Sequence, residues 1–485
     1  MVRTDLDACL SVRDGRLFVE ECDAAELAAR HGTPLFVVSE DQLRRTLRRI
    51  RDAFASGWTD GPVRVLPSIK ANVALALRRI LNEEGAGCDA FGAAELEIAL
   101  RAGVDPAGIS VNGPKDQATV NRAVTAGAKV TLDHVDELAL VADAVRRLGR
   151  PATIRPRVRP DLAGLDMPSD WLEDETPVRI AAHVYKAGIP AEDVLAMGAE
   201  ALSIDGVTVS GVHVHVGRHR SEPAYWAQVI DDVADFLGRM RDAWGGWIPG
   251  EIDVGGGLPV PRDPFGRDMS RLRDRPTERA PDVEAYAGVI TETLRGGLRR
   301  VGMSTDGMAL EVEPGRALYG DAGVHLTTVT RVKRQERPLA WTWVETDSSE
   351  NFLPDVFLEH NRWFFVVANR ADAPAVIRAD VVGASCNPDR ILPEADLPAV
   401  EPGDVIAVLD TGAYQDALAN NFNALSRPAT LLVTGDRSEV IRRAETLDDV
   451  LARDVVPSRL AGGEVVRLPD TAAVPTTPDP ATPAR

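Results

Sequence analysis

The residues whose types could do chemistry in this chain are a lysine, a triple glycine, a glutamate and an arginine. They are Lys70 in LPSIKAN, Gly255, Gly256 and Gly257 in EIDVGGG, and Glu313 and Arg316 in EVEPGR. A lysine amine in a restricted site can form an imine with an aldehyde. Backbone N–H groups of successive glycines can approach an anion such as phosphate, and an arginine can hold phosphate through two parallel hydrogen bonds. Each residue alone has an ordinary explanation, a solvated lysine or a tight turn, so only the set carries weight.

A histidine completes the chemical set. His215 lies near the end of VSGVHVHVG, and its imidazole could lie flat on an aromatic ring, while Glu313 could pair with a protonated ring nitrogen. An aldehyde, a phosphate and a pyridinium nitrogen together describe pyridoxal 5′-phosphate (PLP), whose ring accepts the electrons of a carbanion. A dinucleotide site gains little support, because no GxGxxG is followed by an acidic residue about twenty positions later.

A metal site is not expected from the sequence. No group of histidine, cysteine and carboxylate residues has the spacing of a zinc site. His213 and His215 alternate along one predicted strand and therefore share a face, but no carboxylate lies near them in the sequence. We therefore predict that the chain holds no metal.

The elements that must position these residues alternate along residues 35–315. Eight β-rich runs are separated by stretches in which apolar residues recur every three or four positions, as in an amphipathic helix. The runs are 63–71, 87–91, 109–113, 129–133, 152–158, 209–217, 251–257 and 308–314. This alternation predicts an α/β fold with a (β/α)8 barrel, whose chemistry gathers where the strands end. The residues expected there are Lys70, Asp89, Asn112, His215, the three glycines, Glu313 and Arg316.

After residue 316 the pattern changes to β-rich runs with turns and almost no helix, which predicts a second, all-β domain. The first residues hold a short strand and a helix that are expected to pack on this β domain. The expected domains are an N-terminal segment 1–35, a PLP-binding barrel 36–316, a C-terminal β domain 317–465 and a disordered tail 466–485. The tail is rich in Pro, Thr and Ala without apolar periodicity.

Composition narrows the class of protein. The 485 residues carry a net charge of −19, which disfavours nucleic acid or an anionic membrane as partner. No run approaches the roughly 18 apolar residues of a membrane helix, and the N-terminus lacks the apolar core of a secretory signal. The four cysteines, Cys9, Cys22, Cys88 and Cys386, are scattered. A reducing cytoplasm is therefore the expected compartment.

The motifs together resemble the fold-type III PLP-dependent decarboxylases, which have an alanine racemase-like fold. The resemblance is greatest to the diaminopimelate decarboxylase branch, with ornithine and arginine decarboxylases as cousins. It spans residues 30–465 and rests on SIKAN, CDAFGAAEL, GVHVHVG, DVGGG, EPGR, GASCNPD and TGAY. It implies cofactor contacts from Lys70, Asp89 (supported by Glu95), His215, Gly255, Gly256, Gly257, Glu313, Gly315, Arg316 and Tyr414.

The resemblance also implies a mechanism and a partner. Lys70 would hold the cofactor as an imine until an α-amino acid displaces it, and Glu313 would keep the ring nitrogen protonated while CO2 leaves. Cys386 is the implied proton donor to the product. Cys386 and Asp389 would reach into the site of a second subunit, so a homodimer with shared sites is expected.

Several positions depart from the family pattern. Asn387 stands where these enzymes usually carry a glutamate, and Leu353 lies about where an arginine usually grips the far carboxylate of the substrate. Arg218 replaces a serine, and could contact either phosphate or substrate, while 164–180 is an unusual insert. The expected substrate-binding residues are Asn387, Asp389, Arg218 and Leu353.

These departures favour decarboxylation of an atypical amino acid, free or carrier-bound, plausibly in specialised metabolism. One alternative is diaminopimelate decarboxylase of lysine biosynthesis. Another is a non-catalytic homologue that binds a protein partner.

Overall fold

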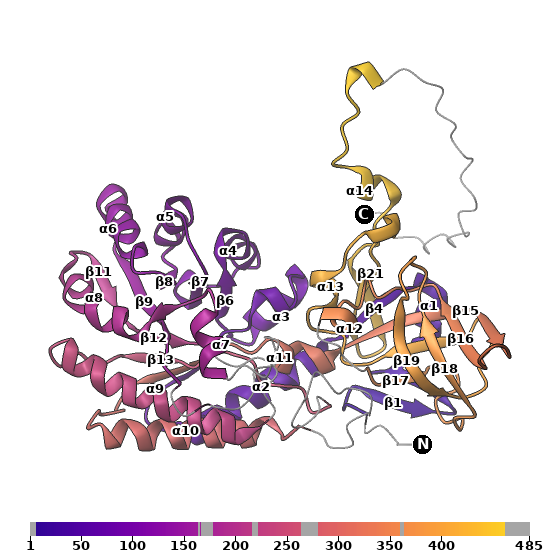
Figure 1. Cartoon of the computed structure of the whole chain (residues 1–485), viewed down its shortest axis with the longest axis horizontal. Coiled ribbons are helices and arrows are strands. Elements are labelled where there is room, and N and C mark those ends of the chain that lie inside the picture. Colours follow the sequence, from indigo (N-terminus) through magenta and orange to yellow (C-terminus); the bar gives the residue numbers. More distant parts are fainter. Residues whose placement is uncertain are drawn as a thin grey trace, which may run out of the picture.

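The computed structural model describes residues 6–162, 165, 178–215, 222–262, 280–358 and 363–460. Arg218, the tail 466–485 and most of the insert 164–180 lie outside the described residues. The chain forms two units that lie side by side, a barrel and a β-rich unit (Figure 1).

Eight parallel strands form the barrel, which confirms the expected (β/α)8 architecture. They are β5 (Val63–Val65), β6 (Cys88–Phe91), β7 (Ile109–Asn112), β8 (Lys129–Leu132), β9 (Ala152–Arg159), β12 (Gly211–Val214), β13 (Glu251–Asp253) and β14 (Ala309–Val312). Their spatial order is β5-β14-β13-β12-β9-β8-β7-β6. A parallel bridge between Ser68 and Asp89 brings the two ends of this order together and nearly closes the barrel.

Helices cover the outside of the barrel (Figure 1). They are α2 (Glu40–Gly57), α3 (Leu75–Glu83), α4 (Gly92–Arg101), α5 (Gln117–Ala126), α6 (Glu137–Leu148), α7 (Val178–Val184), α8 (Ala191–Ser203), α9 (Pro223–Ala243) and α10 (Val283–Arg300). Gly85, Gly103 and Gly149 have positive φ just beyond the ends of α3, α4 and α6, as is common where a helix stops.

Helix α2 illustrates why these segments fold as they do. The Ser39 hydroxyl accepts a hydrogen bond from the Gln42 N–H and so caps the first turn. Leu43, Leu47 and Phe54 recur on one face and are almost fully buried against the barrel. Each such side chain contributes about 1.5–3 kcal/mol by leaving water.

The first barrel strand is shorter than the sequence indicated, and this changes the position of the lysine. Strand β5 ends at Val65, and Lys70 lies on a 3₁₀ turn, η1 (Ile69–Ala71), rather than at the end of a strand. Pro67 has no N–H for a further ladder bond, which favours the end of the strand. Asp89 is likewise the second residue of β6, not its last. The run 209–217 is divided at Ser210 into β11 (Val207–Val209) and β12.

The second unit contains a nine-stranded sheet with main order β19-β18-β16-β15-β4-β21-β22. Its strands are β4 (Leu35–Ser39), β15 (Gly323–Gln335), β16 (Trp341–Thr346), β17 (Phe365–Val367), β18 (Ile377–Val382), β19 (Arg390–Leu397), β20 (Val405–Val408), β21 (Ala429–Thr434) and β22 (Arg437–Arg442). Strand β4 pairs with β15 and β21, so residues 36–39 of the expected barrel range belong to this sheet. The remaining domain limits stay a prediction.

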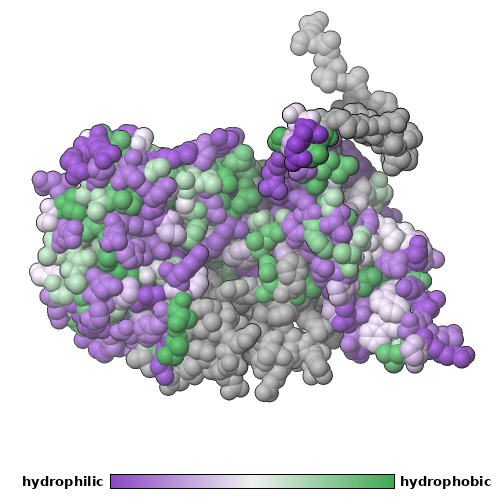
Figure 2. Space-filling model, turned by 45° about the horizontal axis from the view of Figure 1, so that its top comes forward, coloured by the Kyte–Doolittle hydropathy of each residue, from purple (hydrophilic) through white to green (hydrophobic). Residues whose placement is uncertain are grey.

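A small N-terminal sheet packs on this unit. It consists of β1 (Leu10–Arg13), β2 (Arg16–Val19) and β3 (Cys22–Asp23), followed by α1 (Ala24–His31). Leu17, Val19 and Leu27 share one apolar cluster with Leu326 and Val405 of the large sheet. The face drawn in Figure 2 mixes hydrophilic and hydrophobic residues. Among the described helices, none is both long and apolar enough to cross a membrane.

Candidate active site

A lysine on the turn after β5 and an aspartate at the second position of β6 form an ion pair. Lys70 Nζ lies 3.2 Å from Asp89 Oδ2, and that oxygen also accepts a hydrogen bond of 2.5 Å from the Ser68 hydroxyl. Asn112 Nδ2 donates to the other Asp89 oxygen at 2.6 Å. The Lys70 side chain is 42% exposed, while Asp89 is almost fully buried. The amine is therefore anchored from below and open on the other side.

The pair fixes the charge of both groups. Burial acts against each charge, but the Asp89 carboxylate outweighs it and holds the pKa of Lys70 above its ordinary value. The Lys70 ammonium and the bonds from Ser68 and Asn112 overcome burial in turn and hold the pKa of Asp89 below its ordinary value. Lys70 is thus protonated, and Asp89 is the base next to it.

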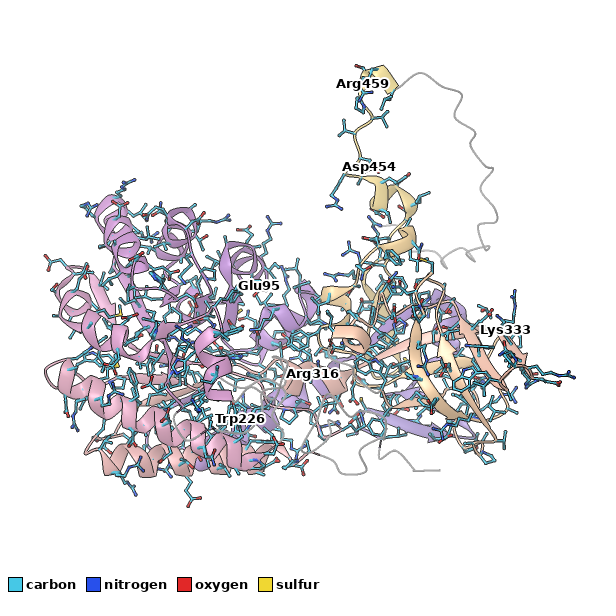
Figure 3. All side chains as sticks on the ribbon, in the orientation of Figure 1. Glu95, Trp226, Arg316, Lys333, Asp454 and Arg459 are labelled. Atoms are coloured by element: carbon cyan, nitrogen blue, oxygen red, sulfur yellow. The ribbon has the colours of Figure 1, made fainter. Side chains whose placement is uncertain are left out.

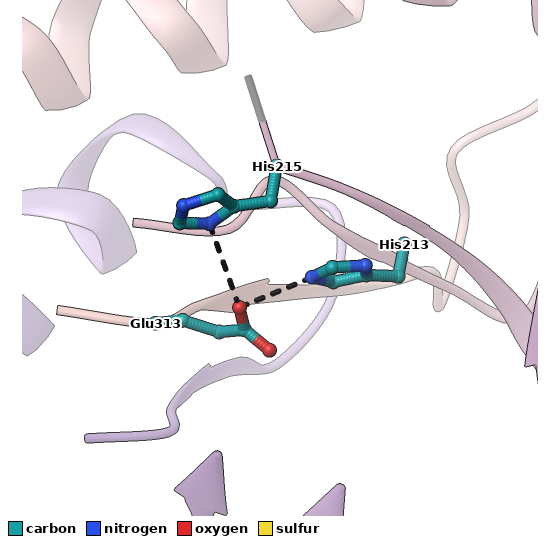
Figure 4. A group of neighbouring side chains, drawn as sticks. All are labelled: His213, His215 and Glu313. Atoms are coloured by element: carbon teal, nitrogen blue, oxygen red, sulfur yellow. Dashed lines mark hydrogen bonds and ion pairs between the residues drawn. The ribbon is translucent and has the colours of Figure 1, made fainter. Parts of the chain in front are cut away.

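Glu313 lies under the same mouth and is held by three neighbours. Asn112 Nδ2 donates to Glu313 Oε1 at 2.7 Å, so one amide bridges the carboxylates of Asp89 and Glu313. His213 Nε2 lies 3.1 Å, and His215 Nδ1 3.8 Å, from Glu313 Oε2. Figure 4 shows the glutamate oxygen pointing at both imidazoles.

Burial decides the protonation states of this group. It lowers the pKa of His213 to about 3, so the ring is neutral. It lowers the pKa of His215 as well. His213 then donates from Nε2 to Glu313, and its Nδ1 has no hydrogen-bond partner among the described residues. Burial, together with the charge of Asp89, raises the pKa of Glu313.

No carboxylate lies near the two histidines in the sequence, but the fold brings one to them. A carboxylate does lie beside His213 and His215, because Glu313 reaches them from a strand one hundred positions away in the sequence. One ligand atom from each of the three residues lies within 4.8 Å of the others. We assign no metal to this group, and the absence of a metal stays a prediction.

The triple glycine forms a turn in which Gly255 and Gly256 leave no room for a Cβ. Gly255 and Gly257 have φ of +72° and +98°, which glycine adopts without strain. A Cβ on Gly256 would lie 2.1 Å from the Glu313 carbonyl oxygen. The Gly256 N–H donates to His215 Nδ1 at 3.1 Å, which ties the turn to the histidine.

Arg316 and Tyr414 join the barrel to the β-rich unit. Arg316 opens the short helix α11 (Arg316–Tyr319) and donates to Asp355 Oδ2 at 2.5 Å. Its guanidinium carbon lies 5.2 Å from the centre of the Tyr414 ring. The Tyr414 N–H donates to the Ala71 carbonyl at 2.6 Å, beside Lys70. Figure 3 places Arg316 between the two units, and a Cβ on Gly315 would lie 2.6 Å from the Tyr414 hydroxyl.

Three expected substrate residues, Asn387, Asp389 and Leu353, lie in the β-rich unit together with Cys386, whereas Arg218 lies outside the described residues. Cys386 is exposed, and its N–H donates to Asn423 Oδ1 at 2.8 Å. Asp389 is buried and accepts from the N–H groups of Glu350, at 2.5 Å, and Ser385, at 2.7 Å.

Asn387 and Leu353 are the two expected substrate residues that replace a glutamate and an arginine of the family pattern. Burial and the charge of Asp389 raise the pKa of Glu350, and a hydrogen bond from the Asn387 side chain partly offsets this rise. Leu353 is 0% exposed and lies in an apolar core. Substrate contacts by these residues stay a prediction.

Sequence reasoning missed several residues that complete the site. Asn112 was expected at the mouth but given no role, whereas it bridges two carboxylates. Ser68, Arg155 and Asp253 were not singled out. Arg155 carried a signal, because a charged residue in the interior of a predicted barrel strand needs a buried partner.

These residues fit PLP. The open Lys70 amine suits its aldehyde, Glu313 can accept the N–H of its ring, and His215 stands beside that carboxylate. The glycine turn, which a Cβ would fill, suits the phosphate. Glu95 holds the end of β6 by accepting the Phe91 N–H at 2.7 Å. Burial raises the pKa of the Glu95 carboxyl group to about 7.

Known proteins resemble this chain over most of its length. A family model described as pyridoxal-dependent decarboxylase, pyridoxal binding domain, matches residues 40–320. Diaminopimelate decarboxylase of Archaeoglobus fulgidus is 31% identical over 93% of this chain and 99% of that protein. The enzyme of that name from Pseudomonas aeruginosa is 30% identical over 91% of this chain and 97% of its own.

Solved structures agree. Diaminopimelate decarboxylase from M. jannaschii in complex with L-lysine superposes with a TM-score of 0.81 at 28% identity, over 93% of this chain and 99% of that one. A lysine/ornithine decarboxylase from Vibrio vulnificus complexed with putrescine gives a TM-score of 0.66 over 84% of this chain and 97% of its own. At 19% identity that likeness shows the fold alone.

Proposed function

We propose that this chain, which belongs to the pyridoxal-dependent decarboxylase family, acts on an amino acid other than meso-diaminopimelate. The cofactor is PLP and the chain is an amino-acid decarboxylase. One observation carries the narrower proposal. Leu353, at about the place of an arginine for the far carboxylate, is fully buried in a core, and nearby Asp355 puts a carboxylate on Arg316.

PLP, when bound, supplies an aldehyde that captures the substrate amine and a ring that accepts the electrons left by CO2. We assign the aldehyde to Lys70 because its amine is open on one side. Asp89 can hold the proton that this amine must lose before it attacks. Asn112 and His213 orient Glu313 toward the ring nitrogen. We assign the phosphate to the glycine turn, with Gly315, Arg316 and Tyr414 beside it.

The charged residues Arg316 and Asp355, where the barrel meets the β-rich unit, argue against meso-diaminopimelate as the substrate. Its far end carries an ammonium and a carboxylate, and each needs a partner once water is excluded. The far carboxylate needs a cation and the far ammonium needs an anion. Among the described residues there, Arg316 and Asp355 already pair with each other. Leaving a buried charge without a partner costs about 3–5 kcal/mol. A site with polar groups placed for one substrate can reject another by roughly 10⁴.

A specific observation favours a second candidate, diaminopimelate decarboxylase, because relatives at about 30% identity carry that name. A non-catalytic homologue is the weakest candidate. Such a protein has no need of the Lys70–Asp89 pair or of the bridged Glu313, and both are intact.

We also propose a homodimer with shared sites in the cytoplasm. Cys386 is exposed, and its loop is held by contacts inside the β-rich unit, which supports a role in the site of a second subunit. We assign to Cys386 the proton given to the product. All four cysteines are unpaired thiols, which supports a reducing compartment.

The test is kcat/KM for meso-diaminopimelate, ornithine, lysine, arginine, glutamate and neutral amino acids, free and attached to a carrier, with CO2 release as the readout. Lys70→Ala is the matched control for background release. We expect diaminopimelate to be a poor substrate. If it is the best by a wide margin, the second candidate is correct.

A further inference from the structure

An arginine lies inside the barrel directly beneath the candidate site. Arg155 on β9 is fully buried, and each guanidinium nitrogen has an acceptor. Its Nη2 donates to Asp253 Oδ2 at 2.6 Å and to the Ser110 hydroxyl at 2.8 Å. Its Nη1 donates to Glu311 Oε2 at 2.5 Å, and its Nε to the Thr131 hydroxyl at 3.0 Å. A planar guanidinium held on every side has one orientation.

Asp253 carries this fixed orientation to the glycine turn. Its second oxygen, Oδ1, accepts the Gly255 N–H at 2.8 Å. The Gly255 carbonyl in turn accepts the Glu313 N–H at 2.8 Å. Arg155 is therefore linked through one carboxylate to the phosphate-binding turn and to the backbone of Glu313.

Arg155 also acts on Glu313 by charge, since its Nη2 lies 4.0 Å from Glu313 Oε1. The titratable and charged groups around Glu313 are Lys70, Asp89, Arg155, Arg157, His213, His215, Asp253 and Glu311. Lys70 must give up its proton in the proposed function, whereas a guanidinium keeps its charge at every pH of interest. Arg155 thus supplies a lasting positive charge beside this carboxyl.

We propose that Arg155 is a positioning residue for PLP, which fixes the glycine turn and the backbone of Glu313 through Asp253 and places a positive charge 4.0 Å from the Glu313 carboxyl group. The proposal concerns the cofactor and holds whichever amino acid is the substrate.

Two variants are expected to shift the pKa of Glu313 in opposite directions. Arg155→Met removes a cation, so the pKa of Glu313 rises. Asp253→Asn removes an anion that raises the pKa of its neighbour, so the pKa of Glu313 falls, while the Asn oxygen can still accept the Gly255 N–H. A charge at this distance shifts a carboxyl pKa by about 1–3 pH units. A general loss of packing would not give opposite signs.

Arg64→Met is the matched control. Arg64 also pairs with Glu311, at 3.1 Å, and with Glu251, at 3.3 Å. It is half exposed and lines a cavity of about 580 Å³ at the amino ends of the strands. Arg64 pairs with these two glutamates and not with Asp253 or Glu313, so PLP binding should be unchanged in this variant.

The experiment measures PLP affinity of each apoenzyme as a function of pH, with circular dichroism to verify folding. On the acid limb, affinity falls as Glu313 becomes protonated. We expect the midpoint of this limb to rise in Arg155→Met and to fall in Asp253→Asn, by about one pH unit or more. In holoenzyme made with PLP labelled with ¹⁵N in the ring, the nitrogen should lose its proton in Arg155→Met and keep it in Asp253→Asn.

Arg155→Met leaves Asp253 without its buried cation and Glu311 with only Lys129 and Arg64 among the described residues, so the variant could fail to fold. In that case Asp253→Asn provides the test, because it removes a buried charge and does not leave one unpaired. Its acid limb is predicted to move to lower pH. An acid limb that stays in place or moves up in Asp253→Asn overturns the proposal. So does a folded Arg155→Met whose acid limb matches that of Arg64→Met.

Discussion

Replacing Asn112 by leucine removes the amide that bridges two buried carboxylates and keeps a side chain of similar size. The wild-type amide donates to Asp89 at 2.6 Å and to Glu313 at 2.7 Å. A hydrogen bond to a charged group contributes about 1.5–3 kcal/mol, so the two together contribute about 3–6 kcal/mol. Part of this is recovered because Glu313 can take up a proton. We expect the apparent free energy of unfolding to fall by about 3 kcal/mol near neutral pH.

The loss should depend on pH in a defined direction. Burial already raises the folded-state pKa of Glu313 above its value in the unfolded chain, so the folded state loses stability as pH rises through that range. Removing the Asn112 donor raises this pKa further. The deficit of Asn112→Leu relative to wild type should therefore grow from acid to alkaline pH and shrink where Glu313 is protonated in both proteins.

The assay is urea denaturation of the apoenzymes at several pH values, followed by fluorescence of the barrel tryptophans. Asn82→Ala is the control, because the Asn82 amide is exposed and, within the described part of the chain, donates to the Gly103 carbonyl at 2.9 Å and to no other group. It should cost about 1 kcal/mol or less at every pH. A deficit for Asn112→Leu that equals this control, or that does not change with pH, would refute the reasoning.

The other predictions concern the glycine turn and the shared site. Gly256→Ala places a methyl group 2.1 Å from the Glu313 carbonyl and should weaken PLP affinity about tenfold or more, as 1–3 kcal/mol of overpacking implies. A methyl group at Gly288 meets nothing within 4 Å, so Gly288→Ala should bind PLP as wild type does. Equal PLP affinities of Gly256→Ala and Gly288→Ala would contradict the prediction. Mixed dimers of the inactive variants Lys70→Ala and Cys386→Ala should regain activity from one intact site. Heterodimers that form and stay inactive would contradict shared sites.

The barrel could be predicted from the sequence because its strands are short apolar runs between amphipathic helices. Lys70, His215 and Glu313 could be placed at one mouth because each follows such a run. The turn that carries Lys70 could not be read so well, since Pro67 ends the strand early although the run continues.

The contacts that complete the site are long-range and have no local signal. The bond between Asn112 and Glu313 joins positions 201 residues apart. Arg155 is separated from Glu311 by 156 positions, so only the closed barrel shows that the buried charges neutralise one another. Asp389 accepts hydrogen bonds from two backbone N–H groups, and a periodicity argument cannot detect such a loop.

The most direct test of the account is to identify the lysine that holds PLP. The purified holoenzyme is treated with borohydride, digested, and its peptides are analysed by mass spectrometry. The account predicts a single PLP adduct on Lys70, the amine that lies 3.2 Å from Asp89 and is open on its other side. An adduct on another lysine, such as Lys115 or Lys129, would contradict it, because the site around Asp89, Asn112 and Glu313 would then not be the site of the chemistry.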